Sequence, residues 1–204
     1  MMTPFHRPLL QGMLILLLGS LATVAVAKNV DEDRNVLEKV VETDGTEALA
    51  AAVLLVDEAG VLPWSLAGDL ANPHGEFVLF APSNTAFEAL LGLAPGTLEG
   101  LSIDEIKHAL PGILSGLGLG AEQVAAVLLK HYTVRTEPVT AENASARALL
   151  ADGSIDMLDG SGFPVGIGAT GITVNGETTV TVEDNFVSNG VVHYIDRVIV
   201  DDLL

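Results

Sequence analysis

The stretch that decides the fold is Asn189-Gly190-Val191-Val192-His193-Tyr194-Ile195-Asp196, a turn followed by an apolar run. Asparagine and glycine are common in turns, because both tolerate backbone conformations that other residues avoid. The apolar residues that follow predict a strand over 191–200. A lone histidine inside an apolar strand is more often a hydrogen-bonded structural residue than a ligand. We therefore expect the polar and small members of this stretch to hold the fold, with the last bound to backbone or a nearby polar group: Asn189, Gly190, His193 and Asp196.

A second apolar run lies about a hundred residues upstream. It reads Gly75-Glu76-Phe77-Val78-Leu79-Phe80-Ala81-Pro82-Ser83-Asn84-Thr85-Ala86-Phe87. Five continuous apolar residues, 77–81, predict a buried strand that ends at a proline. Ser83 or Asn84 then caps a short helix. The expected structural residues of this run are Phe77, Phe80, Pro82, Asn84 and Phe87.

Together the two runs resemble the two signature motifs of the fasciclin domain, in the same order and at a domain-sized separation. The resemblance covers roughly residues 33–203, which is nearly all of the chain after its apolar N-terminus. It implies an α+β fold: a fasciclin-like, wedge-shaped β-sandwich with helices packed along one side. It also implies an extracellular adhesion or interaction module that is not an enzyme, and it leaves the partner open.

Helical patterns fill the first half of the chain. Residues 35–41 and 48–56 have helical apolar spacing or strong helix formers, with Asp44 as the expected cap of the second helix and Gly60 as its end. Ser102 begins a capping box whose helix should break at Pro111-Gly112. A further helix is expected over 121–132.

Strand patterns fill the second half. Residues 154–160 indicate a strand and a turn, and residues 172–182 alternate around Asn175-Gly176. This dipeptide is a strong hairpin signal, because both residues accept the positive φ of a type I′ turn. Helices first and strands later independently indicate an α+β domain.

The N-terminus has the features of an export signal. Arg7 precedes an uncharged segment, 9–27, which ends in the small-x-small pattern Ala25-Val26-Ala27. A retained membrane anchor is the alternative, although the apolar run is marginal for a spanning helix. We expect a signal peptide at 1–27, a polar leader at 28–33 and a single fasciclin domain at 34–203. Cleavage would leave no membrane span and a secreted location, either extracellular or periplasmic.

Composition excludes several classes of partner. The chain has no cysteine and a formal net charge of −18, so it forms neither disulfides nor thiolate metal sites, and nucleic acid is a poor partner. The acidity suits solubility, with divalent cation binding as the alternative. However, the acidic runs at 31–33 and 201–202 lack the ligand spacing of a calcium loop. We expect no bound metal and no cofactor.

Two places are candidate binding residues. His131-Tyr132 lies where fasciclin domains usually carry a Tyr-His pair linked to packing and to receptor adhesion, but here the order is reversed. Animal members carry an Asp-Ile adhesion pair just before the final strand. Here Asp184 matches the Asp and Asn185 replaces the Ile, with Phe186 beside it. Animal-type integrin recognition is therefore unsupported, but an exposed 184–186 corner remains a candidate contact.

The resemblance to the fasciclin family implies an adhesion module that contacts a cell-surface or matrix protein or a polysaccharide. The alternative is a soluble cell-envelope protein that holds a small apolar ligand between sheet and helices, motivated by a Gly- and Leu-rich stretch at 93–120. An enzyme would require a convergent catalytic cluster, for example His108, His131 and a carboxylate. The sequence offers no such spacing and no Gly-x-Ser-x-Gly motif.

Overall fold

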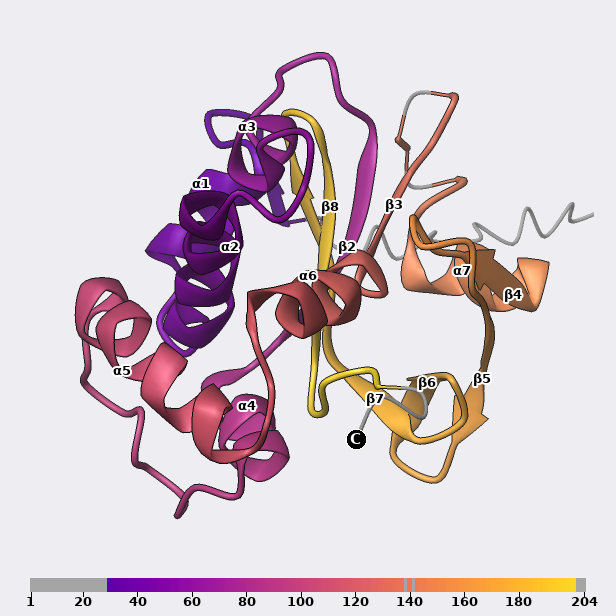
Figure 1. The fold of residues 1–204 in the computed structure, drawn as a ribbon. Coiled ribbons are helices and arrows are strands. Elements are labelled where there is room, and N and C mark those ends of the chain that lie inside the picture. Colours follow the sequence, from indigo (N-terminus) through magenta and orange to yellow (C-terminus); the bar gives the residue numbers. More distant parts are fainter. Residues whose placement is uncertain (1–28, 138, 141, 201–204) are drawn as a thin grey trace, which may run out of the picture.

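The computed structural model describes residues 29–137, 139–140 and 142–200 (Figure 1). The expected signal peptide lies outside these residues. The helices are α1 (Val36–Glu42), α2 (Glu47–Ala59), α3 (Leu66–Leu70), α4 (Asn84–Leu91), α5 (Ile103–Gly116), α6 (Ala121–Leu129) and α7 (Ala146–Asp152). The strands are β1 (Asn29–Asp31), β2 (Phe77–Pro82), β3 (Tyr132–Val134), β4 (Ser154–Asp156), β5 (Gly162–Gly168), β6 (Gly171–Val174), β7 (Thr178–Val187) and β8 (Gly190–Ile195). This is the expected α+β fold.

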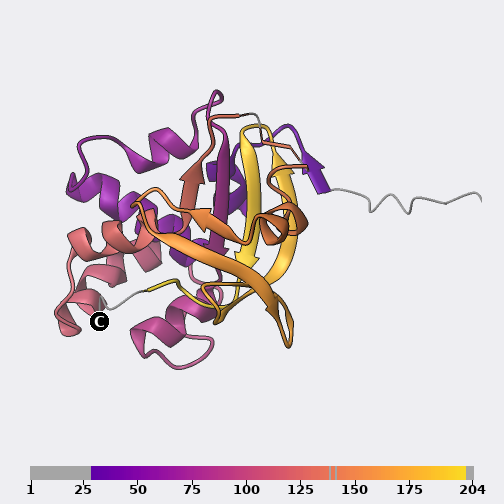
Figure 2. The same cartoon turned by 90° about the vertical axis from the view of Figure 1, so that its right-hand side faces the viewer.

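The strands form one continuous path in the order β3-β2-β8-β7-β6-β5-β4, with β1 added in parallel to β7. β2 and β8 also pair in parallel, which places the two signature runs side by side. β7 has ten residues and two irregularities in its pairing with β8. Such bulges bend a strand, so β7 connects two differently oriented halves of the sheet, as Figure 2 shows.

Two apolar cores lie on opposite faces of β2. Phe77 and Leu79 pack into the core shared with α1–α6, whereas Val78 and Phe80 pack into the core shared with α7 and β4–β6. Figure 1 shows α1–α5 on the left of β2 and β8, α6 crossing in front of these strands, and α7 with β4 on the right. Successive strand residues point to opposite faces, so a strand covered on both sides must be apolar throughout. The expected buried strand at 77–81 is therefore confirmed.

Several helix starts follow the local signals. Asn35 and Ser102 form complete capping boxes, and Ser83 accepts a hydrogen bond from the backbone of Ala86. The expected Asp44 cap of α2 is wrong. Instead, Oδ1 of Asn84 accepts from the amide of Ala48 at 2.9 Å, so a residue of the upstream signature run caps α2 from a distance.

Three boundaries differ from the sequence expectation. α5 continues through Pro111-Gly112 to Gly116, because Ile106, Leu110 and Leu114 form a buried stripe that holds both halves against the core. α6 ends at Leu129, and β8 ends at Ile195. The hairpin at 172–182 is confirmed: Asn175 and Gly176 both have positive φ, and Val174 pairs with Thr178 across a three-residue loop.

Candidate functional site

Asn189 joins three separate segments at the start of β8. Its Oδ1 accepts from the amide of Val36 at 2.8 Å, and its Nδ2 donates to the carbonyls of Leu70 and Asn72, both at 2.9 Å. The side chain is buried, so these contacts satisfy groups that water does not reach. Asn189 thereby fixes the beginning of α1 and the segment that follows α3.

Gly190 is required by close packing. A Cβ at this position would lie 2.3 Å from the carbonyl oxygen of Phe77, its partner in β2. No rotamer change relieves a clash with backbone, so any side chain would push β2 and β8 apart. The first two residues of the deciding stretch are thus structural, as expected.

His193 is a buried structural histidine. Its ring stacks on Phe80 with centroids 5.4 Å apart. Nδ1 accepts from the amide of Asp184 at 3.2 Å, which leaves Nε2 as the protonated nitrogen that donates to the carbonyl of Ala144 at 3.1 Å. Burial lowers the pKa of His193, so the neutral ring is the form that the fold holds.

The segment 184–186 is not the exposed corner that the sequence suggested. Asn185 is 6% exposed and Phe186 is 7% exposed; Nδ2 of Asn185 donates to the carbonyl of Val192, and Phe186 belongs to the α7-side core. β1, inside the expected polar leader, pairs directly with this segment. Asp184 is partly exposed, but its carboxylate accepts from the amide of Ala146 at the start of α7.

His131 and Tyr132 are each 1% exposed. Nδ1 of His131 donates to the carbonyl of Val127 at 2.7 Å, and Nε2 accepts from the amide of Ile199 at 2.9 Å. Burial lowers the pKa of His131 to about 4. Because both ring nitrogens bond to backbone, His131 is unavailable as a catalytic base or ligand in this arrangement.

The ring of Tyr132 packs against that of Phe77 at an interplanar angle of 60°, with ring centroids 6.2 Å apart. Its hydroxyl has no hydrogen-bond partner among the described residues, and burial raises its pKa. The pair therefore ties the end of α6 to β2 and to the segment after β8. A direct contact of either side chain with a partner stays a prediction.

The remaining signature residues also bond within the fold. Nδ2 of Asn84 donates to the carboxylate of Glu47 at 2.7 Å. Asp196 accepts from the amide of Thr179 at 2.7 Å, which confirms the expected bond to backbone. Pro82 ends β2 as expected.

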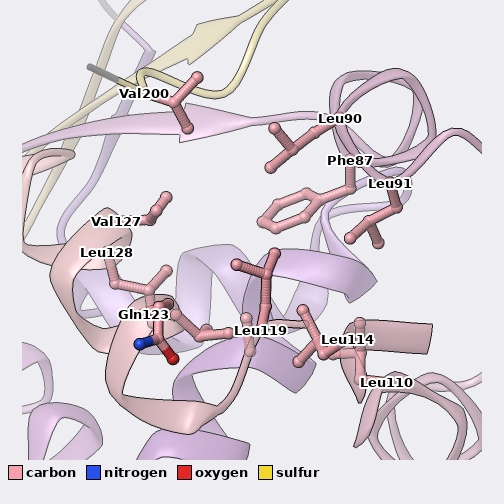
Figure 3. Close-up of a pocket in the computed structure, with 12 residues that line it drawn as sticks. Phe87, Leu90, Leu91, Leu110, Leu114, Leu119, Gln123, Val127, Leu128 and Val200 are labelled. Atoms are coloured by element: carbon pink, nitrogen blue, oxygen red, sulfur yellow. The ribbon is translucent and has the colours of Figure 1, made fainter. Parts of the chain in front are cut away.

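A small apolar cavity lies among the helices (Figure 3). It is lined by residues of α2, α4, α5 and α6, by Leu119 between the last two helices and by Val200, rather than by sheet and helices as the ligand hypothesis expected. The cavity measures about 50 Å³, and Gln123 is the polar side chain in its wall. Figure 3 shows apolar side chains converging on it from opposite sides, among them Phe87, Leu90, Leu114, Leu119 and Val127.

A shallow depression surrounds α3, in a part of the chain that the sequence patterns do not single out. Trp64, Ser65, Gly68, Asp69, Asn72 and Pro73 line it. Trp64 is the single tryptophan of the chain and is 39% exposed. Its only sequence signal is an aromatic residue ahead of the turn cluster at 72–75.

Hydrogen bonds at both ends fix the segment that forms this depression. The carboxylate of Asp57 accepts from the hydroxyl of Ser65 and from the amides of Leu66 and Ala67. Asn189 holds the other end through Leu70 and Asn72. The buried Asn189 thus holds one end of the segment that carries the exposed Trp64.

Within the described part of the chain, no group of three or more His, Asp or Glu side chains is arranged to hold a metal ion. No single described helix is long and apolar enough to cross a membrane, although α5 and α6, bent by 105° at their junction, would meet that criterion together.

The fold and the buried signature residues define a fasciclin-type scaffold. Residues 49–201 match the family described as Fasciclin domain, and the chain belongs to that family. The two signature runs of the chain form β2 and β8, which pair side by side as parallel strands of one sheet.

Similar proteins come from animals and bacteria. The chain is 26% identical over 178 residues to the transforming growth factor-beta-induced protein ig-h3 of Sus scrofa, covering 87% of this chain and 21% of that protein. It is 28% identical over 128 residues to human periostin, covering 63% of this chain and 12% of that protein. Protein sll1483 of Synechocystis sp. is 28% identical over 187 residues, with 87% of this chain and 86% of that protein covered. The chain thus spans about a fifth or less of the two animal relatives.

The fold matches a solved structure of a FAS1 domain pair from the insect cell adhesion molecule Fasciclin I. The TM-score is 0.59 at 12% identity, and the match covers 84% of this chain and 52% of the other. At this identity the match concerns the fold.

Proposed function

We propose that this protein is an exported fasciclin-type adhesion or interaction module that contacts a cell-surface or matrix protein without catalysing a reaction. The observation that carries the proposal is the family match over 49–201. It is supported by the likeness in fold to a domain pair from a molecule described as a cell adhesion molecule.

The use of the signature residues supports a non-catalytic role. Asn189, His193 and His131 all have their polar atoms bonded to backbone. Catalytic groups must instead face a site that substrate can enter. Recognition on this scaffold therefore belongs to exposed loops held by a buried hydrogen-bond network.

The acidity of the chain limits the chemical classes of partner that it can bind. A net charge of −18 repels anionic membranes and anionic polysaccharides unless cations bridge them, and it favours partners with basic surfaces. We therefore place a protein partner ahead of a polysaccharide.

Direct binding tests this function. The purified full-length protein would be passed over immobilised matrix from the producing cells, over the same matrix treated with protease, and over matrix treated with glycosidase. The proposal expects saturable binding that protease removes. Binding that only glycosidase removes would replace the protein partner with a polysaccharide, and a chelator arm would show whether cations bridge that contact. Absence of binding to every matrix would contradict the proposal.

The cavity of Figure 3 favours a second candidate, a carrier of a small apolar ligand. Its walls are almost entirely aliphatic, which suits an alkyl group. However, about 50 Å³ is small beside the roughly 150 Å³ of an engineered apolar cavity that admits benzene. The carrier would therefore hold the end of a single alkyl chain. Native mass spectrometry of the protein from its producing cells would show an added mass if this function holds, and the bare chain mass if it does not.

A further inference from the structure

We propose that the depression around α3 is a docking site for an arginine side chain of a protein partner, with Trp64 contacting the face of the guanidinium and Asp69 pairing with its charge. The inference rests on the proposed function, because it names the surface and the partner chemistry of that same adhesion module. Nothing in the family match assigns a role to these residues.

Trp64 offers the aromatic half of the site. Tryptophan is the strongest side-chain partner for a cation above an aromatic ring, and arginine is the cation most often found there. Trp64 lines the depression, and 39% of the residue is exposed. Tryptophan and arginine are also the residues that most often dominate the energy of protein interfaces.

Asp69 offers the charged half. It lines the same depression and is partly buried. Burial raises the pKa of its carboxyl, which means that the carboxylate is incompletely hydrated. No salt bridge among the described residues reaches Asp69. A carboxylate in this condition gains from an incoming cation, and a guanidinium can donate two parallel hydrogen bonds to it.

The backbone under these two side chains is pre-arranged. Asp57 fixes the start of α3 and Asn189 fixes the segment after it. A site that is already ordered loses less conformational entropy on binding. The net charge of −18 adds long-range attraction for a basic partner.

The single tryptophan makes the site directly observable. The full-length protein would be titrated with the peptide acetyl-Gly-Arg-Gly-Arg-Gly-amide while Trp64 fluorescence is recorded. The same peptide with citrulline in place of arginine is the control, because citrulline keeps the shape and loses the charge. We expect a saturable fluorescence change with the arginine peptide and none with the citrulline peptide. Equal changes with both peptides, or no change with either, would overturn the proposal.

Two variants distinguish a specific contact at Asp69 from general attraction of the peptide by the acidic protein. Asp69→Asn should weaken binding about fivefold, as expected for one partly screened charge pair. Glu99→Gln removes the same charge from an exposed position in the loop between α4 and α5 and should change affinity by less than about twofold. Equal losses in both variants would mean non-specific attraction and would overturn the proposal.

Variants that lack Trp64 have no tryptophan fluorescence, so their binding of the arginine peptide is measured by calorimetry. Trp64→Ala should abolish measurable binding, and Trp64→Phe should retain part of it because the aromatic face remains. If a neutral oligosaccharide such as cellopentaose changes the fluorescence and the arginine peptide does not, the site is a sugar platform and the arginine proposal fails.

Cell attachment distinguishes this inference from the broader function. If Trp64→Ala supports attachment as well as the original protein, the adhesion function stands and this site is not its contact. If the original protein gives no attachment, the adhesion function fails whatever the peptide titration shows.

Discussion

The backbone amide of Asp184 donates a hydrogen bond to Nδ1 of His193 at 3.2 Å, and this contact fixes which ring nitrogen carries the proton. Nε2 of the same ring then donates to Ala144, while the carboxylate of Asp184 accepts from Ala146. His193 and Asp184, the second of which is a candidate adhesive residue by its sequence position, thus act together to attach α7 to the sheet.

We expect the contact between α7 and the sheet to persist when an amide replaces the carboxylate of Asp184. Asp184 has a positive φ of 61°, a conformation that asparagine also tolerates. Asp184→Asn keeps an oxygen acceptor for Ala146 and should change the free energy of unfolding by less than about 0.5 kcal/mol. Asp184→Ala loses the acceptor and strains the backbone, and should cost about 1–3 kcal/mol. Urea denaturation measures both. If correctly folded Asp184→Asn no longer supports attachment of cells to a surface, the charge of Asp184 contacts a partner instead.

Stability should fall as the pH drops from 7 to 5. His131 has a folded pKa of about 4, against about 6.5 for an unperturbed histidine. The unfolded chain therefore binds more protons in this window, and each pH unit below 6.5 costs up to about 1.4 kcal/mol for His131. The lowered pKa of His193 acts in the same direction.

Urea titrations at pH 7.5, 6 and 5 measure this effect. The carboxylates with lowered pKa, Asp31, Glu105 and Asp159, titrate below the window. Relief of acidic repulsion opposes the histidine effect, and it does so equally in a His131→Gln variant, which lacks the titrating ring. If the original protein and His131→Gln show the same dependence of the unfolding free energy on pH, the burial of a neutral His131 is contradicted.

Gly190 and Gly112 should respond oppositely to alanine. Gly190→Ala places a Cβ 2.3 Å from the Phe77 carbonyl oxygen and should cost at least about 3 kcal/mol or prevent folding. Gly112 lies inside α5 with nothing within 4 Å of the added Cβ, and Gly112→Ala should stabilise by about 0.5–1 kcal/mol. Thermal denaturation compares them. A tolerated Gly190→Ala would mean that the β2–β8 contact is looser than the structure has it.

Asn189→Ala should be among the most damaging polar substitutions. It leaves the Val36 amide and two carbonyls without the partner they have now, at about 1–3 kcal/mol for a buried group left unsatisfied. Ser188→Ala is the neighbouring control, because its hydroxyl bonds to Arg34 at an exposed position and should contribute about 0.5–1.5 kcal/mol. If both variants lose equal stability, Asn189 is not the junction described here.

Local signals in the sequence predicted local structure. The Asn175-Gly176 turn and the Ser102 capping box depend on residues a few positions apart, and both are present. The prediction that the helix breaks at Pro111 is wrong, because the packing of Leu110 and Leu114 outweighs the local cost of a proline inside the helix. Likewise, Asn84 caps α2 across 36 positions in the chain, which no local pattern indicates.

The candidate site shows the same division. The structural roles of Asn189, Gly190, His193 and Asp196 were predictable from their place in a turn and an apolar strand. The burial of Asn185 and Phe186 was not, because it depends on β1 and on the core around α7, which form through contacts distant in sequence. The sequence does not single out Trp64, because the depression that it lines is formed by a segment that Asp57 and Asn189 hold through contacts from outside it.

Attachment of the producing cells to a surface tests the proposed adhesion function most directly. Three conditions would be compared: gene intact, gene deleted, and gene deleted with purified residues 28–204 supplied from outside. We predict that deletion reduces attachment and that the added protein restores it. Unchanged attachment on deletion, or a loss that the added protein does not restore, would contradict an adhesion module acting through its own surface.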